Sequence, residues 1–154
     1  MGWHTRLAEL GIELPTVPTP SGAYVLGVVT GGLLYVSGQT WKRDGAQALV
    51  GRVGAEVSIE EAAEGARHSA LACIAEASAI LGDLERVERV VRVGGFVRSA
   101  TGFDRQPAVI DGASSVLLEI FGPAAGGHAR TSVGVAELPG GAAVEIDVIF
   151  SVRD

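Results

Sequence analysis

The sequence predicts an α+β fold in which about six strands form a mixed sheet and two helices pack on one of its faces. Two observations carry this prediction. Short valine-rich segments with apolar residues at every second position alternate with longer segments whose apolar residues recur at helical spacing. The chain also has 154 residues, 47% of them hydrophobic, which is enough for one compact domain with a substantial core.

The N-terminal region is expected to be a short helix followed by an extended arm. Residues 4–12 carry leucines on one helical face, and Gly11 supplies a stop signal. Prolines within residues 14–20 disfavour helix at each preceding position. We therefore separate residues 1–22 from a single domain that covers residues 23–154.

The domain is expected to open with a β-hairpin. Strands at about residues 23–29 and 33–37 flank Thr30-Gly31-Gly32, a typical hairpin turn. Residues 40–57 are polar and contain several glycines, and we expect a short strand near residues 48–50 within them.

A long helix is expected to follow this segment. Ser58 and Glu61 have the spacing of a capping box, in which each side chain bonds the backbone N–H of the other residue. The helix should end at Gly82, because glycine readily adopts the left-handed conformation of a helix C-terminus. A valine-rich strand is expected at residues 87–97.

A second helix and two more strands should complete the chain. The helix is expected at about residues 107–121, with Asp104 as its cap and Gly122-Pro123 as its end. Residues 131–136 and 144–152 both alternate with period two, so each is expected to be a strand.

Arg130 and Glu145 lie near the start of these last two strands. If the tight turn at residues 138–141 folds the strands into a hairpin, a guanidinium and a carboxylate come near one end of it. Arginine holds a carboxylate through two parallel hydrogen bonds, so this end is a candidate site for a small carboxylate-bearing molecule. A structural ion pair of Arg130 with Glu145 or Glu137 is the alternative.

One face of the predicted sheet has nothing to cover it. Both helices are expected on the same face, yet strand segments such as 33–36 and 87–93 are too apolar to face water. The sequence therefore predicts self-association through the sheet.

Composition argues against several classes of partner. The net charge is −6, aromatic residues make up 5% of the chain, and no run of basic residues exists, so nucleic acid is not an expected partner. The single Cys73 leaves no intrachain disulfide, and we expect it to be buried and unreactive. No signal segment, membrane-spanning run or metal-ligand spacing is apparent, which favours a cytoplasmic protein without a membrane partner or a metal.

Six short motifs occur along the chain, each once, in a specific order and spacing. They are Tyr24-Val25-x-Gly27, Tyr35-Val36-Ser37-Gly38-Gln39, Gly82-Asp83-Leu84-x-x-Val87, Ala129-Arg130-Thr131-x-Val133, Val135-Ala136-x-Leu138-Pro139 and Val144-Glu145-Ile146. Together they resemble the RidA/YjgF family of imine deaminases and their relatives, over residues 24–152. Segments 10–15, 110–114 and 126–130 resemble a side subgroup with a longer N-terminus.

The resemblance implies a fold, an assembly and a reaction. It implies the chorismate-mutase-like fold and a homotrimer with sites between neighbouring subunits. The implied reaction hydrolyses 2-aminoacrylate and 2-imino acids to 2-oxo acids and ammonia, with no metal or organic cofactor. By the same resemblance Arg130 binds the substrate carboxylate, Glu145 positions or activates water, and Tyr24, Ser37 and Gly38 line the cleft.

Two segments depart from the pattern of the deaminases. Ser132 stands where the deaminases often have cysteine, and it keeps a small polar group for substrate binding. Residues 111–114 replace an Asn-x-x-Tyr pattern, so either Asp111 or Ser114 takes the place of the asparagine. An Asp111 carboxylate near the cleft would oppose an anionic substrate. His128 is expected to be a loop residue, and its entry into the cleft as an acid or base is the alternative.

Other functions stay open at this point. The first alternative is a non-catalytic trimer that binds small carboxylate metabolites through the same arginine. A ribonuclease or translation inhibitor is a remote alternative, and the acidic balance of the chain argues against it. A chorismate mutase is more remote still, because a dicarboxylate substrate would need more cationic residues.

Overall fold

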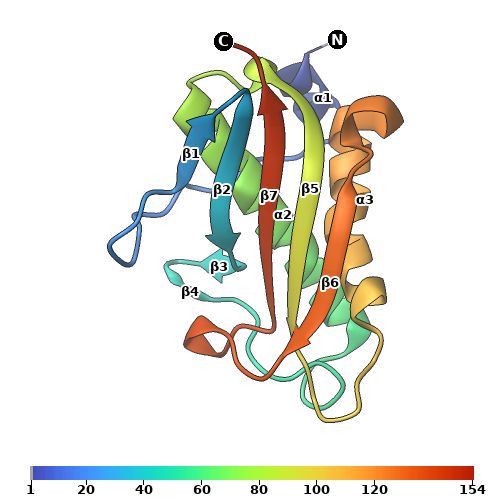
Figure 1. The fold of residues 1–154 in the computed structure, drawn as a ribbon. Helices are drawn as coiled ribbons and strands as arrows, with labels where there is room; N and C mark the ends of the chain where they lie inside the picture. Colours follow the sequence, from blue (N-terminus) through green and yellow to red (C-terminus); the bar gives the residue numbers. More distant parts are fainter. Residues whose placement is uncertain (1) are drawn as a thin grey trace.

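The computed structural model describes residues 2–154, and Met1 lies outside the described residues. Five strands form one mixed sheet in the order β1-β2-β7-β5-β6 (Figure 1). These strands are β1 (Gly27–Thr30), β2 (Leu33–Gln39), β5 (Val87–Arg98), β6 (Ala129–Val135) and β7 (Val144–Val152). The helices are α1 (Trp3–Glu9), α2 (Ile59–Leu81) and α3 (Gln106–Gly126), with short 3₁₀ turns at Leu84–Arg86 and Pro139–Gly141.

The α+β class is confirmed, but the main sheet has five strands instead of about six. The strand expected near residues 48–50 does not join it; Val50 makes only an isolated bridge to Ala142. The polar excursion instead forms a separate small hairpin of β3 (Lys42–Arg43) and β4 (Ala46–Gln47). Charged and polar residues suit a hairpin that lies outside the core.

The first hairpin has the predicted turn but a shorter first strand. Gly31 and Gly32 both adopt positive φ, at 57° and 73°, which a tight turn between twisted strands requires. β1 begins at Gly27 and not near residue 23, because its ladder with β2 ends at the pair of Gly27 with Val36. Tyr24 therefore lies in the segment that precedes the strand.

Helix α2 has the predicted ends. The Glu61 N–H donates to Ser58 Oγ at 3.1 Å, and the Ser58 N–H donates to Glu61 Oε2 at 2.8 Å. At the other end Gly82 has a φ of 75°. The buried face of α2 is rich in alanine, so the helix lies close to the sheet and to α3. A Cβ atom at Gly112 of α3 would collide with the Ala63 carbonyl of α2, and this close approach fixes where α3 lies.

Helix α3 differs from its prediction at the N-terminal end, while the predicted break at Gly122-Pro123 is confirmed. Asp104 does not cap it: the residue before the helix is Arg105, and its side chain makes no capping bond. The backbone breaks at Gly122, with a φ of 70°, and Pro123 then begins one further turn, since proline suits a first helical position. By length and composition α3 is apolar enough to span a membrane, but its buried side packs against β5 and α2, as a core helix does.

The last two strands do not form the predicted hairpin. β6 pairs with β5 in parallel, and β7 pairs antiparallel with both β5 and β2, so β5 lies between β6 and β7 (Figure 1). The reason is the connection: β5 and β6 are joined through α3, and a helical crossover suits parallel neighbours. The turn at Pro139–Gly141 therefore carries the chain past the end of β5.

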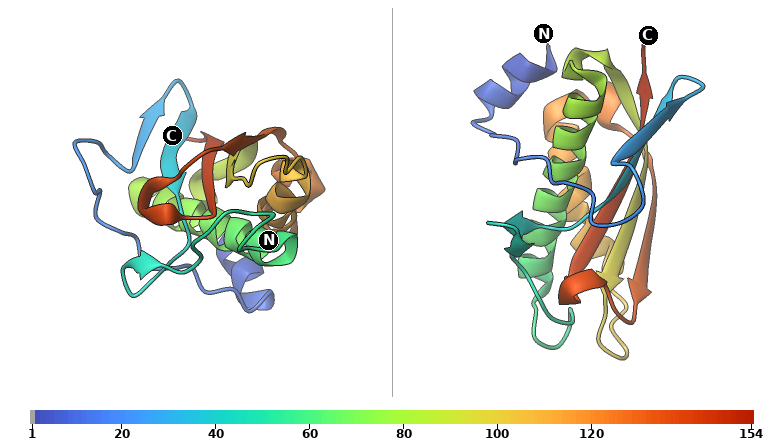
Figure 2. Two further views of the ribbon diagram at one scale, coloured as in Figure 1. Left: turned by 90° about the horizontal axis from the view of Figure 1, so that it is seen from below. Right: turned by 90° about the vertical axis from the view of Figure 1, so that its left-hand side faces the viewer.

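The helices cover one face of the sheet only, as predicted. Figure 2 shows α1, α2 and α3 on one side and no element over the other. On β7 every second residue from Val144 to Val152 is buried against the helices. The opposite face carries Val28, Tyr35 and Val133, which are 51%, 44% and 40% exposed. Apolar side chains of this size on an open sheet mark a surface for association.

Candidate functional site

Arg130 lies on the helix side of β6 and reaches α3. Its register partner on β5 is the buried Val93, which sets the direction of the side chain. Nη1 donates to Asp111 Oδ1 at 2.7 Å and to Ser114 Oγ at 3.1 Å, and Nη2 donates to the Pro107 carbonyl at 3.4 Å. The guanidinium is therefore held in one orientation by three acceptors of α3.

The ion pair of Arg130 differs from both predicted alternatives. Its partner is Asp111, not Glu145 or Glu137. Glu137 instead accepts from Arg52 and Arg98, each at 2.7 Å. The two arginine side chains lower the pKa of Glu137, mainly through the hydrogen bond from Arg98.

Asp111 and Ser114 both accept hydrogen bonds from Arg130. The sequence left open which of them replaces the asparagine of the deaminases, and in the structure both contact the guanidinium. They stand three residues apart on α3 and share one face of the helix with Leu118, four residues further on. Together with Gly127, His128 and Arg130 they line an open cavity of about 340 Å³.

His128 belongs to this cavity, in line with the alternative that the sequence left open. Its Nδ1 lies 2.6 Å from the Gly126 carbonyl, which can only accept, so Nδ1 carries the proton. In the neutral ring Nε2 is then the acceptor, and the Ser114 hydroxyl donates to it at 2.9 Å. A directed chain of hydrogen bonds results, from Arg130 through Ser114 to His128. The only sequence signal for it was the spacing of two between His128 and Arg130.

Ser132 lies two residues after Arg130 on the same side of β6. Its hydroxyl oxygen is buried and has no hydrogen-bond partner among residues 2–154, and Ser132 does not line the 340 Å³ cavity. Its predicted role in substrate binding therefore has no contact to support it in the single chain.

A second cavity, of about 240 Å³, contains Tyr24, Gly38 and Glu145. Its wall also includes Gln39, Thr40 and Lys42, none of which was predicted as a site residue. Lys42 is the only lysine in the chain and closely follows the Ser37-Gly38-Gln39 motif, and that signal was available in the sequence.

Tyr24 and Ser37 are both held by local hydrogen bonds. The Tyr24 hydroxyl lies 3.3 Å from Ser21 Oγ at the wall of the second cavity. The Ser37 hydroxyl donates to the Val25 carbonyl at 2.7 Å and does not line the cavity. Ser37 thus holds the segment that carries Tyr24, while Gly38 forms the wall.

Glu145 is packed against Gly38. A Cβ atom at residue 38 would lie 3.0 Å from Glu145 Cδ and Oε2, so any larger residue there would push the carboxyl group from its position. Burial raises the pKa of Glu145 above its usual range, and the nearby Asp147 carboxylate raises it further. A carboxylate with a raised pKa is a better general base near neutral pH.

The two cavities do not meet within one chain. Arg130 faces the helices, whereas Glu145 alternates with the buried Val144 and Ile146 and lies on the uncovered face. The predicted meeting of Arg130 and Glu145 at a hairpin end is therefore wrong, because β5 separates their strands. The chain presents two half-sites instead: the Arg130 half-site (Asp111, Ser114, His128 and Arg130) and the Glu145 half-site (Tyr24, Gly38, Lys42 and Glu145).

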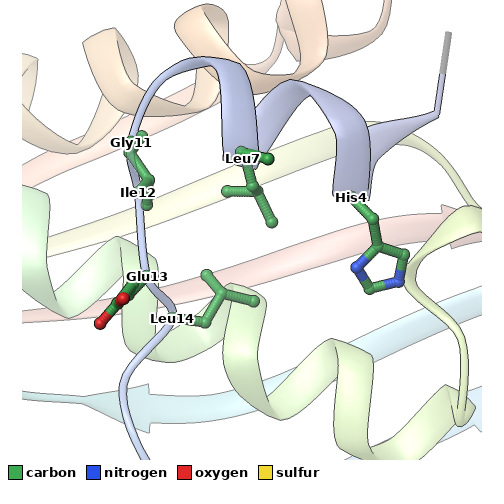
Figure 3. Close-up of a pocket in the computed structure, with 7 residues that line it drawn as sticks. His4, Leu7, Gly11, Ile12, Glu13 and Leu14 are labelled. Carbon is green, nitrogen blue, oxygen red and sulfur yellow. The ribbon is translucent and has the colours of Figure 1, made fainter.

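A third hollow lies beneath α1, away from both half-sites (Figure 3). Leu7 and Leu14 point toward one another across it, and the Glu13 carboxylate points away. His4 at its rim lies 3.4 Å from Asp83. This hollow is the packing seam of the N-terminal segment and contains none of the predicted site residues. Among residues 2–154 no group of three or more His, Cys, Asp or Glu side chains is arranged to hold a metal ion.

A five-stranded mixed sheet with helices on one face is the architecture of a chorismate-mutase-like α+β protein. The family model described as "YjgF/chorismate_mutase-like, putative endoribonuclease" matches residues 4–144. The chain therefore belongs to the RidA/YjgF family, as its motifs predicted.

Three relatives show how similar the chain is to known proteins. Protein TCP17 of Trypanosoma cruzi is 43% identical over 149 residues, which cover 97% of this chain and 93% of that protein. A 2-iminobutanoate/2-iminopropanoate deaminase of Dermatophagoides farinae is 33% identical over 142 residues, covering 92% and 95%. The crystal structure of Atu1372 from Agrobacterium tumefaciens, a protein of unknown function, has 39% identity and a TM-score of 0.89, covering 98% of this chain and 92% of that one.

Proposed function

We propose that this protein is a homotrimeric deaminase that hydrolyses 2-aminoacrylate and 2-imino acids to 2-oxo acids and ammonia. The observation that carries the proposal is the separation of the Arg130 and Glu145 half-sites on one chain, beside a sheet face that exposes apolar side chains. Arg130 lies on β6, an edge strand of the sheet, and an assembly that sets this edge against the uncovered face of a neighbour would bring the Arg130 half-site of one subunit to the Glu145 half-site of the next. The deaminase of Dermatophagoides farinae, a full-length relative, supports the choice of reaction.

Each residue has a role that its surroundings suit. Arg130 would bind the substrate carboxylate, because the acceptors of α3 already hold its guanidinium in place. Glu145 would position the attacking water and accept a proton from it, since its raised pKa makes it a stronger base than an exposed glutamate. Tyr24 and Gly38 would close the cleft around the substrate. A C=N bond is electrophilic without help, so the reaction needs no cofactor.

Mixing two inactive variants tests both the reaction and the shared site. Arg130→Ala and Glu145→Gln should each abolish turnover of freshly generated 2-iminopropanoate. The two variants are mixed in equal amounts, unfolded and refolded together, so that random trimers form. Each cleft then has about one chance in two of an intact arginine and one in two of an intact glutamate, so about a quarter of the clefts contain both. Activity should then return to roughly a quarter of the wild-type value. Full turnover by Arg130→Ala alone would refute the mechanism, and a mixture without any recovery would refute the shared cleft.

A non-catalytic carboxylate-binding trimer is the second candidate. The Arg130 half-site favours it, because Ser114 and the Pro107 carbonyl hold the guanidinium without any contact to Glu145. Wild-type protein that binds 2-oxobutanoate but does not accelerate imine hydrolysis would support this candidate. Ribonuclease activity, which the description of the family model mentions, would need RNA cleavage that survives purification and is lost in Arg130→Ala.

A further inference from the structure

The Arg130 half-site offers both a cation and an anion to a ligand. Asp111 and Ser114 occupy Nη1 of the guanidinium, whereas Nη2 has only the long contact to Pro107 and Nε has no hydrogen-bond partner among residues 2–154. The edge formed by Nε and Nη2 thus keeps free donors for a second carboxylate.

Asp111 also keeps free capacity. Only its Oδ1 accepts from Arg130, its Oδ2 accepts no hydrogen bond from the described residues, and its side chain is 67% exposed. A carboxylate has about four acceptor positions on its two oxygens. Asp111 can therefore bind a cationic group while it still holds Arg130.

These charges discriminate between kinds of ligand. A molecule that carries only a carboxylate is attracted by Arg130 and repelled by Asp111. A molecule with a carboxylate and a cationic nitrogen on the neighbouring carbon satisfies both residues, because Asp111 and Arg130 are themselves only 2.7 Å apart. The site is therefore complementary to a ligand that carries a negative and a positive group on neighbouring carbon atoms.

We propose that Asp111 is a specificity residue that selects the protonated imine, a 2-iminium carboxylate, over the 2-oxo acid. This inference rests on the proposed deaminase function. In the reaction the oxygen of water forms a bond to C2, the C2–N bond breaks, and the nitrogen leaves as ammonium with both protons of the water. The iminium and water thus give the 2-oxo acid and ammonium, with charge and atoms balanced. The positive charge leaves C2, so Asp111 then repels the product and favours its release.

Two stable ligands with the same carbon skeleton test the inference. 2-Aminobutanoate carries an ammonium group where 2-hydroxybutanoate carries a hydroxyl group, and calorimetry gives the Kd of each. The ratio of the two Kd values is the readout, because any effect of Asp111 on the shared carboxylate cancels in it. We expect the wild type to bind the amino acid about fivefold more tightly, the strength of a good exposed ion pair, and Asp111→Asn to bring the ratio to about one.

The control is Asp104→Asn, which removes an exposed carboxylate just before α3 that makes no ion pair among residues 2–154. It should leave the ratio unchanged. The inference is overturned if the wild type binds the hydroxy acid as tightly, binds neither ligand, or keeps its preference in Asp111→Asn; Asp111 then serves only to hold Arg130.

The rate of 2-iminobutanoate hydrolysis, measured on the same samples, separates this inference from the proposed function. A protein that does not accelerate hydrolysis but shows the Asp111-dependent ratio refutes the deaminase and keeps the specificity. An active deaminase whose ratio does not depend on Asp111 refutes the specificity and keeps the deaminase.

Discussion

The two half-sites differ in how their charges are compensated. In the Arg130 half-site a guanidinium meets a carboxylate at 2.7 Å, and a chain of hydrogen bonds continues through Ser114 to His128. In the Glu145 half-site the carboxyl group has no ion-pair partner among the described residues, and its pKa is raised by burial and by Asp147. The first holds its ion pair within one chain, while in the second Glu145 forms no ion pair although Lys42 lines the same cavity.

A second carboxyl group without an ion-pair partner among the described residues, that of Glu76, lies in the core near the Glu145 half-site. Glu76 of α2 is fully buried, and neither of its oxygens has a hydrogen-bond partner among residues 2–154. Burial raises its pKa to about 8, and Lys42 only partly opposes the shift. Burial raises the pKa of the Cys73 thiol, and Glu76, Asp147 and Glu145 raise it further, so Cys73 is protonated and unreactive as predicted. The comparison shows that the guanidinium of Arg130 is fixed by an ion pair, whereas the pKa of Glu145 is raised because burial outweighs any nearby positive charge.

The largest expected effect is on catalysis at the Glu145 half-site. Glu145→Gln keeps the shape of the side chain and removes the base, so kcat should fall by about 10²–10⁴-fold while KM changes little. Steady-state rates on 2-iminopropanoate measure this. The control is Glu60→Gln, an exposed residue on α2. A kcat within threefold of wild type would contradict a catalytic role.

The next effect concerns stability and pH. Folded Glu76 holds its proton up to about pH 8, whereas the unfolded chain releases it near 4.5. The folded state therefore binds more protons across this window, and the free energy of unfolding falls as pH rises through it, by on the order of 4 kcal/mol. Glu76→Gln should remove most of this loss. Denaturant melts of the wild type and of Glu76→Gln at pH 6 and pH 9 measure this loss. If the unfolding free energy of both proteins changes equally between the two pH values, Glu76 is ionised in the folded state and the prediction is wrong.

A smaller effect is expected where helices cross behind the Arg130 half-site. Gly112→Ala places a methyl group against the Ala63 carbonyl, and the overpacking should cost about 1–3 kcal/mol of unfolding free energy. Gly38→Ala, against the end of the Glu145 side chain at 3.0 Å, should cost less stability but more activity. Thermal melts and catalytic rates of both variants test this. A larger loss of stability in Gly38→Ala than in Gly112→Ala would contradict the prediction and show that the helix crossing accommodates the added methyl group.

The smallest effect belongs to the hydrogen-bond chain. Ser114→Ala removes the link between Arg130 and His128 but leaves the ion pair with Asp111, so unfolding free energy should change by only about 1 kcal/mol. KM should rise by less than tenfold, because Asp111 still orients the guanidinium. A loss of turnover as large as that expected for Arg130→Ala would mean that Ser114 contacts the substrate directly.

The sequence by itself determined the local elements and the family. The capping box of Ser58 and Glu61, the end of α2 at Gly82 and the turn at Gly31-Gly32 all appear as predicted. Each depends on the backbone preferences and hydrogen bonds of residues within a few positions of one another, which a single sequence displays directly.

Only the tertiary structure decided how the site is divided. A predicted hairpin placed Arg130 beside Glu145, yet β5 lies between their strands because α3 joins β5 to β6 in parallel. Strand order follows from contacts between residues far apart in the chain, whose free energies no local pattern records. The same holds for the Asp111 partner of Arg130, for Lys42 beside Glu145 and for the buried Glu76, all of which depend on which surfaces the packed layers bring together.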